Sequence, residues 1–472
     1  MASGFRGVLL LKANLAIFAT HIIRHHPMKT YASIRLLRLI ICAVTVTSLS
    51  ITMSSAHAAQ DPTLTDFDYR QCEGSFMPYP APAEIIATPD SLRPVLINHV
   101  GRHGARYYSS PRDVEAIREA LQNASSIGTI TPLGKKLMAL TDVIMAKSKG
   151  RWGALDSLGM AEQRGIAARM VRTYPTLFKD GRIDAISSKT PRCVNSMYSF
   201  LYQVTRLHNS VNINAASGPQ EAPLMRPYDV DEAYITWADE APWRKTLDDY
   251  ISVTAPLTPL IKILGKSYPI QPDEARDLVM SLYKVLAGLE AMMLPQDVSE
   301  YLTRDEYNRL WSCNNLHQYL VRTATTLSTI PAEISIPLLK DIIATTDRAV
   351  ESDRTAGRNK HDMESSEPTV ILRFGHAETL MPLLSQMRLP GCYYMTNYFD
   401  TVGKHWQNFH VVPMAANLQI ILFRHHRKGT YYVRFQLNEV PLSLNPDDPS
   451  QIYLPWDVAR KRLQRCVPFY AQ

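Results

Sequence analysis

The stretch VLINHVGRHGAR at residues 95–106 decides how the rest of the chain is interpreted. Its first part, Val95 to Gly101, is mostly apolar and predicts a buried strand. The strand runs into Arg102-His103-Gly104-Ala105-Arg106, where two guanidinium groups accompany an imidazole. Arginine offers paired donors that match phosphoryl oxygens, and a neutral imidazole nitrogen can attack phosphorus. We therefore interpret the turn as a phosphate site that contains a nucleophile, rather than as an ordinary cluster of charged surface residues.

Two further segments share this plan of an apolar run followed by a polar turn. Residues 183–188 lead into Lys189-Thr190-Pro191-Arg192, and residues 369–374 lead into Gly375-His376-Ala377-Glu378. If the three runs are neighbouring parallel strands of an α/β sheet, their turns lie together at its carboxyl edge, where such sheets bind ligands. The pattern predicts one pocket built from three distant parts of the chain.

The second turn has the signature of a helix start. Thr190 is placed to cap a helix, and Pro191 suits the first helical position. Arg192 would then lie in the opening turn, where free backbone N–H groups also favour an anion. We expect Arg192 to face the same ligand as the first turn.

The composition is that of a globular chain large enough for two domains, with 472 residues of which 46% are hydrophobic and 20% charged. Five prolines indicate an irregular N-terminal arm over residues 60–90. We expect a discontinuous α/β domain over residues 91–205 and 361–472. A mostly helical insertion domain over residues 206–360 would interrupt it.

Local periodicity supports this division. Helical spacing of apolar residues is evident from Glu274 to Met293 and from Ile336 to Val350. Strand-like runs from Asn417 to Arg424 and from Thr430 to Leu437 flank Lys428-Gly429. These two runs predict a hairpin that completes the sheet.

The first 59 residues have the composition of an export signal. They contain six basic and no acidic residues, then an apolar stretch from Leu36 to Ile51 and the small-x-small triplet Ala56-His57-Ala58. This pattern predicts a signal peptide over residues 1–59 and a periplasmic or secreted protein, with Met28 as an alternative start. A transmembrane anchor is the alternative, disfavoured because Arg38 and several hydroxyl side chains interrupt a short apolar stretch.

Removal of this leader changes the charge balance. Subtracting its six basic residues from 51 leaves 45 against 44 acidic residues, so net charge does not favour a nucleic-acid partner. The remaining cysteines allow at most two disulfides, in a pairing that the sequence leaves open, and their spacing is too wide for a zinc knuckle. They are Cys72, Cys193, Cys313, Cys392 and Cys466.

Together, these motifs resemble the histidine acid phosphatase superfamily (clade 2). Arg102-His103-Gly104-Ala105-Arg106 stands near the expected mature N-terminus, and Gly375-His376-Ala377-Glu378-Thr379 follows far downstream. The His-Ala-Glu triplet, where many members have His-Asp, is similar to the multiple inositol polyphosphate phosphatase branch of phytases. The resemblance implies an α/β fold with a central, mostly parallel sheet flanked by helices (phosphoglycerate mutase-like) and a mostly α-helical inserted domain. Tyr108 stands where the family pattern often has proline, which concerns the loop geometry and not the nucleophile.

The resemblance also implies roles for individual residues. His103 would be the nucleophile, Glu378 the proton donor and His376 a further catalytic donor. Arg102, Arg106 and Arg192 would bind the phosphoryl oxygens, and Lys189 an additional substrate phosphate. The structural alternatives are a buried structural histidine at His376, a helix cap at Glu378 and a solvated side chain at Lys189.

We therefore expect an exported phosphomonoesterase that hydrolyses inositol hexakisphosphate (phytate) and lower inositol phosphates through a phosphohistidine. No metal, no cofactor, no nucleic-acid partner and no stable membrane anchor after signal cleavage are expected. Two alternatives are a broader acid phosphatase or glucose-1-phosphatase of the same fold, and a protein that binds phosphorylated ligands without turnover. The second is disfavoured because binding alone needs neither a nucleophile nor a proton donor.

Overall fold

The computed structural model describes residues 65–467 except residues 180, 357–366 and 446. The predicted signal peptide, its cleavage site and the alternative start at Met28 lie outside these residues. Within them, no helix combines the length and the apolar character needed to cross a membrane.

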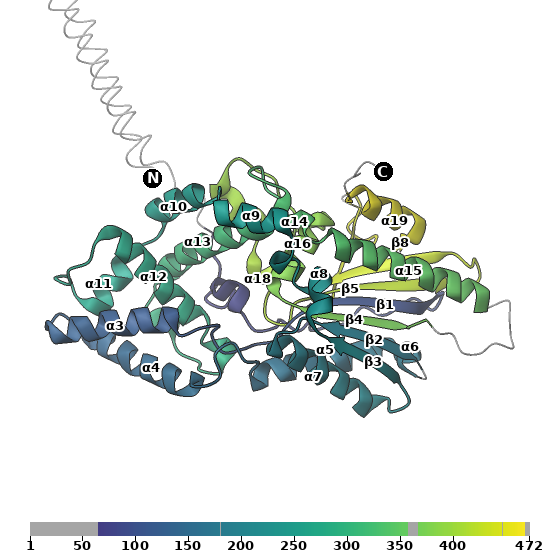
Figure 1. Ribbon diagram of the computed structural model, residues 1–472, viewed down its shortest axis with the longest axis horizontal. Helices are drawn as coiled ribbons and strands as arrows, with labels where there is room; N and C mark the ends of the chain where they lie inside the picture. Colours follow the sequence, from purple (N-terminus) through teal and green to yellow (C-terminus); the bar gives the residue numbers. More distant parts are fainter. Residues whose placement is uncertain (1–64, 180, 357–366, 446, 468–472) are drawn as a thin grey trace, which may run out of the picture. The chain divides into compact units, whose positions relative to one another are not determined.

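An eight-stranded sheet is the centre of the described structure (Figure 1). Its order is β3-β2-β4-β1-β5-β6-β7, and β8 pairs with β6. The strands are β1 (Leu92–Arg102), β2 (Arg182–Ser187), β3 (Asn212–Ser217), β4 (Val370–Gly375), β5 (Asn417–His425), β6 (Tyr431–Leu437), β7 (Val440–Leu442) and β8 (Leu454–Pro455).

The three predicted strands are parallel neighbours, as expected. Strand β4 lies between β1 and β2, with Arg102 opposite Gly375 and Ser187 opposite Phe374. Their polar turns therefore meet at one edge of the sheet. The predicted hairpin is also present, as antiparallel β5 and β6. Because β5 returns antiparallel beside β1, the sheet is mixed, and its parallel part consists of β1 to β4.

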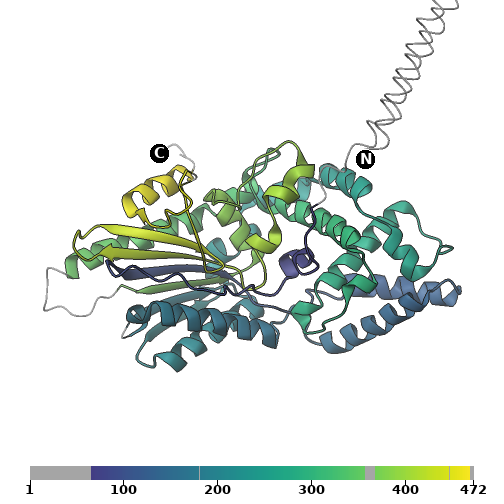
Figure 2. The ribbon, with the colours of Figure 1, turned by 180° about the vertical axis from the view of Figure 1, so that it is seen from behind.

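Helices cover both faces of the sheet. Alternate side chains of β1 point to opposite sides, and the apolar ones on each side are buried under helices. Leu96 and Val100 pack with α15 and α16, whereas Ile97 packs with α5 and α7 on the other face. Figure 2 shows the two layers from behind. The helices are α5 (Ser157–Thr173), α7 (Pro191–Leu207), α15 (Ile336–Ala356) and α16 (Ala377–Gln386), with α6 (Pro175–Phe178), α8 (Ala222–Met225) and α19 (Trp456–Arg465) near the sheet.

A second group of helices lies beyond the carboxyl edge of the parallel strands (Figure 1). Its core joins Ile117 and Leu137 to Val279 and Leu310. The longer helices of this region are α3 (Arg112–Ser126), α4 (Pro132–Ser148), α9 (Glu232–Glu240), α10 (Arg244–Thr254), α11 (Thr258–Leu264), α12 (Pro272–Ala287) and α13 (Arg304–Arg322). Short helical turns connect these elements: η1 (Gln71–Phe76), η2 (Pro219–Glu221), η3 (Pro227–Asp229), η4 (Glu290–Met292), η5 (Val298–Glu300), η6 (Phe399–Thr401), α14 (Ile330–Glu333), α17 (Val402–His405) and α18 (Asn408–Val411).

The packing divides the chain differently from the predicted boundaries. Helices α3 and α4 belong by sequence to the expected segment 91–205, yet their apolar sides pack against α11 and α12. Conversely, β3 and α15 fall within 206–360 but join the sheet and cover it. The reason is topological: the turn after β1 opens at the carboxyl edge, so the helices that follow it reach the helical region directly. The helical region thus receives two separate stretches of the chain.

The five described cysteines are buried and free. Neither of the two disulfides that the sequence allows is formed among them.

Candidate active site

The turn after β1 is fixed by backbone hydrogen bonds to two neighbouring strands. The N–H of His103 donates to the carbonyl of Gly375 (3.0 Å), and the N–H of Arg102 donates to the carbonyl of Ala416 (2.7 Å). On its other side, the His103 carbonyl accepts from the N–H of Ala415 (3.0 Å). His103 is therefore held at the end of the sheet with little freedom to shift.

Helix α5 supports the same turn from below. The Gln163 amide donates to the Arg102 carbonyl (2.9 Å), and the Glu162 carboxylate accepts from the N–H of Ala105 (2.7 Å). The approach is so close that a Cβ on Gly159 would lie 2.2 Å from the Ala105 carbonyl oxygen. Only glycine fits there without a shift of backbone.

His103 has the protonation state that a nucleophile requires. Its side chain is buried, and Nδ1 lies 2.9 Å from the carbonyl oxygen of Gly104, so Nδ1 carries the proton and donates. This tautomer leaves the lone pair on Nε2 free. Burial, followed by the positive charges of Arg102 and Arg192, lowers the pKa of His103 well below its ordinary value. The imidazole is therefore neutral across the physiological range.

Three guanidinium groups surround this imidazole, and each has one N–H donor without a hydrogen-bond partner among the described residues. Arg102 Nη1 donates to the carbonyls of Ser75 (2.6 Å) and Val412 (2.5 Å), which fixes its orientation. The Nε groups of Arg102, Arg106 and Arg192 are buried, and no group in the described part of the chain accepts a hydrogen bond from them. Buried donors without partners are rare and costly, so this cluster fits an anion that would accept from them.

Electrostatics point the same way. Burial, reinforced by repulsion from Arg192 and Arg102, lowers the pKa of Arg106 to about 9. Burial also lowers the pKa of Arg102 to about 10. Arg102 and Arg106 therefore still carry their charges at neutral pH, and a bound phosphate would relieve the repulsion within the cluster.

The turn after β4 places a second imidazole at the same point. His376 is the N-cap of α16, and its ring centroid lies 5.6 Å from that of His103. Its Nδ1 lies 3.2 Å from Arg192 Nη2, and its Nε2 lies 3.0 Å from the Ser188 hydroxyl. Burial lowers the pKa of His376 to about 3, opposed by the carboxylate of Glu378 and assisted by the positive charges of Arg192 and Arg226. Both ring nitrogens of this neutral imidazole therefore have partners on neighbouring elements.

Glu378 lies in the first turn of α16 and remains partly open, with 37% of its side chain exposed. Burial opposes its ionisation, but Arg322 and His376 outweigh that effect and lower the pKa of the carboxyl to about 2. The nearest cation is Arg322, whose Nη2 lies 3.9 Å from Oε1. In the empty site Glu378 is a carboxylate.

Lys189 is the one sequence-predicted site residue that does not join this cluster. It is exposed, and no hydrogen bond or ion pair to it is present within the described residues. Thr190 is the N-cap position of α7, as expected, but its hydroxyl accepts from Arg226 (2.8 Å) instead of capping the helix. A contact between Lys189 and a substrate phosphate stays a prediction.

Comparison with known proteins agrees with this arrangement. Residues 241–438 match the model of the histidine phosphatase superfamily (branch 2). The human protein named multiple inositol polyphosphate phosphatase 1 (Homo sapiens) is 26% identical over 377 residues, which cover 74% of this chain and 75% of that protein. Both comparisons show that the chain is similar to the histidine phosphatase superfamily, as the motifs predicted.

Solved structures of two such phosphatases share the fold of this chain. The multiple inositol polyphosphate phosphatase of Bifidobacterium longum, in complex with phosphate, superposes with a TM-score of 0.69 at 17% identity, covering 85% of this chain and 99% of that one. The phytase from D. castellii superposes with a TM-score of 0.63 at 15% identity, covering 85% of each chain. The expected superfamily, α/β fold class and phosphatase character are thereby confirmed.

The structure adds three residues that the sequence motifs of this phosphatase did not indicate. Arg226 Nη1 lies 3.1 Å from His376 Nε2, and its guanidinium faces the ring of Tyr228 at 5.1 Å. Arg322 faces the same ring from another helix, at 5.7 Å. All three lie in the stretch 206–360, where the sequence shows helical periodicity but no chemical motif. In the sequence, the only feature that marks these three residues is an arginine near a tyrosine. Many surface helices share that feature, so it does not indicate a site.

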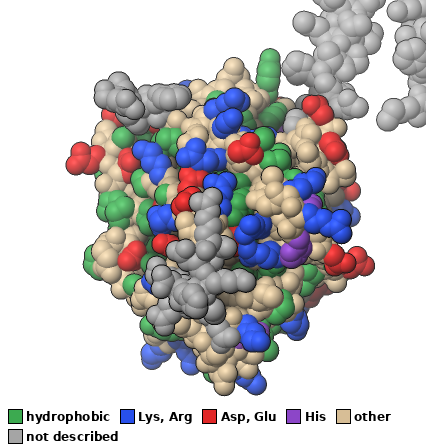
Figure 3. Space-filling view, turned by 90° about the vertical axis from the view of Figure 1, so that its right-hand side faces the viewer, with side chains coloured by type: hydrophobic (Ala, Val, Ile, Leu, Met, Phe, Trp, Pro, Cys, Tyr) green, Lys and Arg blue, Asp and Glu red, His purple; other side chains and the backbone are tan. Residues whose placement is uncertain are grey.

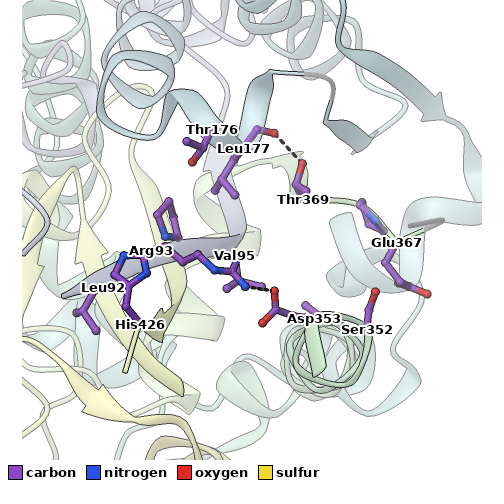
Figure 4. A pocket seen from close by; sticks show the side chains of 13 residues that line it. Leu92, Arg93, Val95, Thr176, Leu177, Ser352, Asp353, Glu367, Thr369 and His426 are labelled. Atoms are coloured by element: carbon purple, nitrogen blue, oxygen red, sulfur yellow. Dashed lines mark hydrogen bonds and ion pairs between the residues drawn. The ribbon is translucent and has the colours of Figure 1, made fainter. Parts of the chain in front are cut away.

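A cavity of about 600 Å³ opens at the opposite, amino edge of the parallel strands (Figure 4). Its main polar groups are already paired: Arg93 with Asp353, and the Thr369 hydroxyl with the Leu177 carbonyl. Figure 3 shows this end of the phosphatase, where basic and acidic side chains are interspersed. Unlike the carboxyl edge, its lining contains one arginine, Arg93, and one histidine, His426, instead of a cluster of guanidinium groups around two imidazoles. It is therefore not the candidate active site.

Proposed function

We propose that this phosphatase hydrolyses phosphate monoesters of inositol through a covalent phosphohistidine on His103. The observation that carries the proposal is a buried, neutral imidazole with a free Nε2, next to three guanidinium groups with unpaired buried donors. Relatives named for inositol polyphosphates support this substrate class.

The first step transfers the phosphoryl group to the enzyme. Nε2 of His103 attacks phosphorus while the ester P–O bond breaks and its electron pair goes to the leaving oxygen. Arg102, Arg106 and Arg192 hold the equatorial oxygens, where charge is concentrated in the transition state.

The leaving alkoxide needs a proton, and Glu378 is placed to give it. Although the carboxyl is ionised in the empty site, a bound phosphate cancels much of the surrounding positive charge and raises its pKa. In the second step the Glu378 carboxylate takes a proton from water as that water attacks phosphorus, while the P–N bond breaks and its electron pair returns to Nε2 of His103. Inorganic phosphate then leaves and the neutral His103 is restored. General acid catalysis of this kind contributes roughly 10²–10⁴-fold.

Phytate is the proposed main substrate because it presents several phosphates to a mouth with additional cations. Arg226 lies beside His376, and exposed Lys189 lies two residues before Pro191 at the start of α7. A broader acid phosphatase or glucose-1-phosphatase of the same fold is the alternative. We also propose export to the periplasm or the exterior, on the basis of the leader-like composition of residues 1–59.

A time course with phytate, resolved by inositol phosphate isomer, tests the substrate. The proposal expects sequential loss of phosphates and weak activity on glucose 1-phosphate, both unaffected by a chelator because the arginines supply the positive charge. His103→Ala should abolish turnover while phosphate still binds. Preference for glucose 1-phosphate over phytate would replace the proposal by the alternative.

A further inference from the structure

One cation next to the proposed proton donor has no part in the reaction described above. Arg322 is the last residue of α13, and its Nη2 lies 3.9 Å from Glu378 Oε1. Its Nη1 donates to the hydroxyl of Tyr234. Its guanidinium also faces the rings of Tyr228 and Tyr234, at 5.7 and 5.8 Å. Arg322 therefore links the helical region to the catalytic helix α16.

The contact between Arg322 and Glu378 is loose. Hydrogen-bonded arginine–carboxylate pairs have N···O distances of about 2.7–2.9 Å, so at 3.9 Å the carboxylate does not satisfy the guanidinium donors. The Arg322 side chain is 23% exposed. It is held by the Tyr234 hydroxyl and by two aromatic rings, which stabilise a guanidinium without fixing its remaining donors.

This pairing works against the role of Glu378 as an acid. A carboxyl must be protonated to donate, and an arginine beside it favours the carboxylate. The other titratable groups that face Glu378 are Arg102, Arg106, His376, Cys193, Tyr228 and Tyr234. Of the cations, Arg102 and Arg106 are neutralised by the phosphate that reacts. Within the described residues, Arg322 makes no hydrogen bond to His103 or to the arginines around it, so a different anion is needed to neutralise its charge.

We propose that Arg322 is a positioning residue that senses a second phosphate on the leaving group. It keeps Glu378 ionised in the empty site, and on binding of a polyphosphorylated ester it turns to that second phosphate and releases the carboxyl. Glu378 then takes a proton from solvent and passes it to the leaving oxygen as the P–O bond breaks. This inference rests on the proposed function. It makes a neighbouring phosphate an activator of the chemical step as well as a binding contact.

The test compares pH profiles of kcat, which report groups in the enzyme–substrate complex, for phytate and for myo-inositol 1-phosphate, which has the same kind of leaving oxygen and no second phosphate. In the wild type, the rate for the monophosphate should decline at a pH about 1–3 units lower than the rate for phytate. In Arg322→Met, the pH at which the monophosphate rate declines should rise to the value seen for phytate. The pH profile for phytate itself should hardly change. Arg322→Lys, which keeps the charge, should preserve the difference between the pH values at which the two rates decline.

Arg309→Met is the matched control, because Arg309 lies on the same helix and pairs with Asp305. It should leave both profiles unchanged. If Arg322→Met does not fold, as judged by circular dichroism, Arg322→Gln carries the same expectation. A variant that slows both substrates equally, with this difference in pH intact, would overturn the inference and leave the proposed function standing. A wild-type enzyme that does not hydrolyse phytate, while hydrolysing the monophosphate, would overturn both.

Discussion

Gly159→Ala tests whether helix α5 sets the position of the nucleophilic turn. The added Cβ would lie 2.2 Å from the Ala105 carbonyl oxygen and 2.6 Å from its nitrogen. These are backbone atoms, so the turn and the helix must separate by about 1 Å to restore an ordinary contact. A misplacement of that size can cost about 10²-fold in rate. We expect kcat/KM to fall by about that factor, which corresponds to roughly 2.7 kcal/mol of transition-state stabilisation.

Gly165→Ala is the matched control, since it introduces the same methyl group into the same helix. Its Cβ would approach only the far end of the flexible Arg169 side chain, at 3.2 Å. Alanine also has the higher helix propensity, by about 1 kcal/mol. The control should therefore be fully active and slightly more stable. The assay is steady-state hydrolysis of nitrophenyl phosphate, with thermal melting of each variant. Full activity of Gly159→Ala would refute the idea that this contact positions His103.

Three further predictions concern single side chains. Glu378→Gln should slow phytate hydrolysis by about 10²–10⁴-fold but nitrophenyl phosphate much less, because only the alkoxide needs a proton; equal slowing of both substrates would count against the acid. Lys189→Met should raise KM for phytate by no more than about fivefold and leave nitrophenyl phosphate unaffected, as expected for an exposed charge; an unchanged KM for phytate would remove Lys189 from the site. His99 is fully buried with neither ring nitrogen hydrogen-bonded, and burial lowers its pKa to about 3. Its unfolded form takes up a proton below about pH 6.5 while the folded form does not, so stability should be lost as pH falls from about 6.5 toward 3, by roughly 4 kcal/mol. His99→Leu should remove this loss in urea titrations at pH 7 and pH 4, and an unaltered pH dependence would contradict the assignment.

The sequence was sufficient for the sheet edge and the residues it gathers. Apolar runs followed by turns with cationic or acid–base residues predicted three parallel strands, because strand burial and ligand binding at a carboxyl edge leave a local signature. His103, Arg192 and His376 meet there as expected. Thr190 and Pro191 also predicted the start of α7 correctly.

The sequence was not sufficient for residues whose position depends on tertiary packing. Arg226 and Arg322 reach the site from the helical region, and nothing in their local sequence distinguishes them from solvated arginines. The same applies to α3 and α4, whose apolar faces fit either the sheet or the other helices. Helical periodicity predicts that a face is buried, but it does not say against which partner.

The central claim, that His103 becomes phosphorylated during turnover, can be measured directly. The enzyme is mixed with phytate, quenched within milliseconds in alkali, which preserves phosphohistidine, and digested for peptide mass spectrometry. The account predicts a phosphoryl group on the peptide that contains His103, and its absence from His103→Ala treated in the same way. Sustained turnover by the His103→Ala variant, or a phosphoryl group on a different residue, would contradict it.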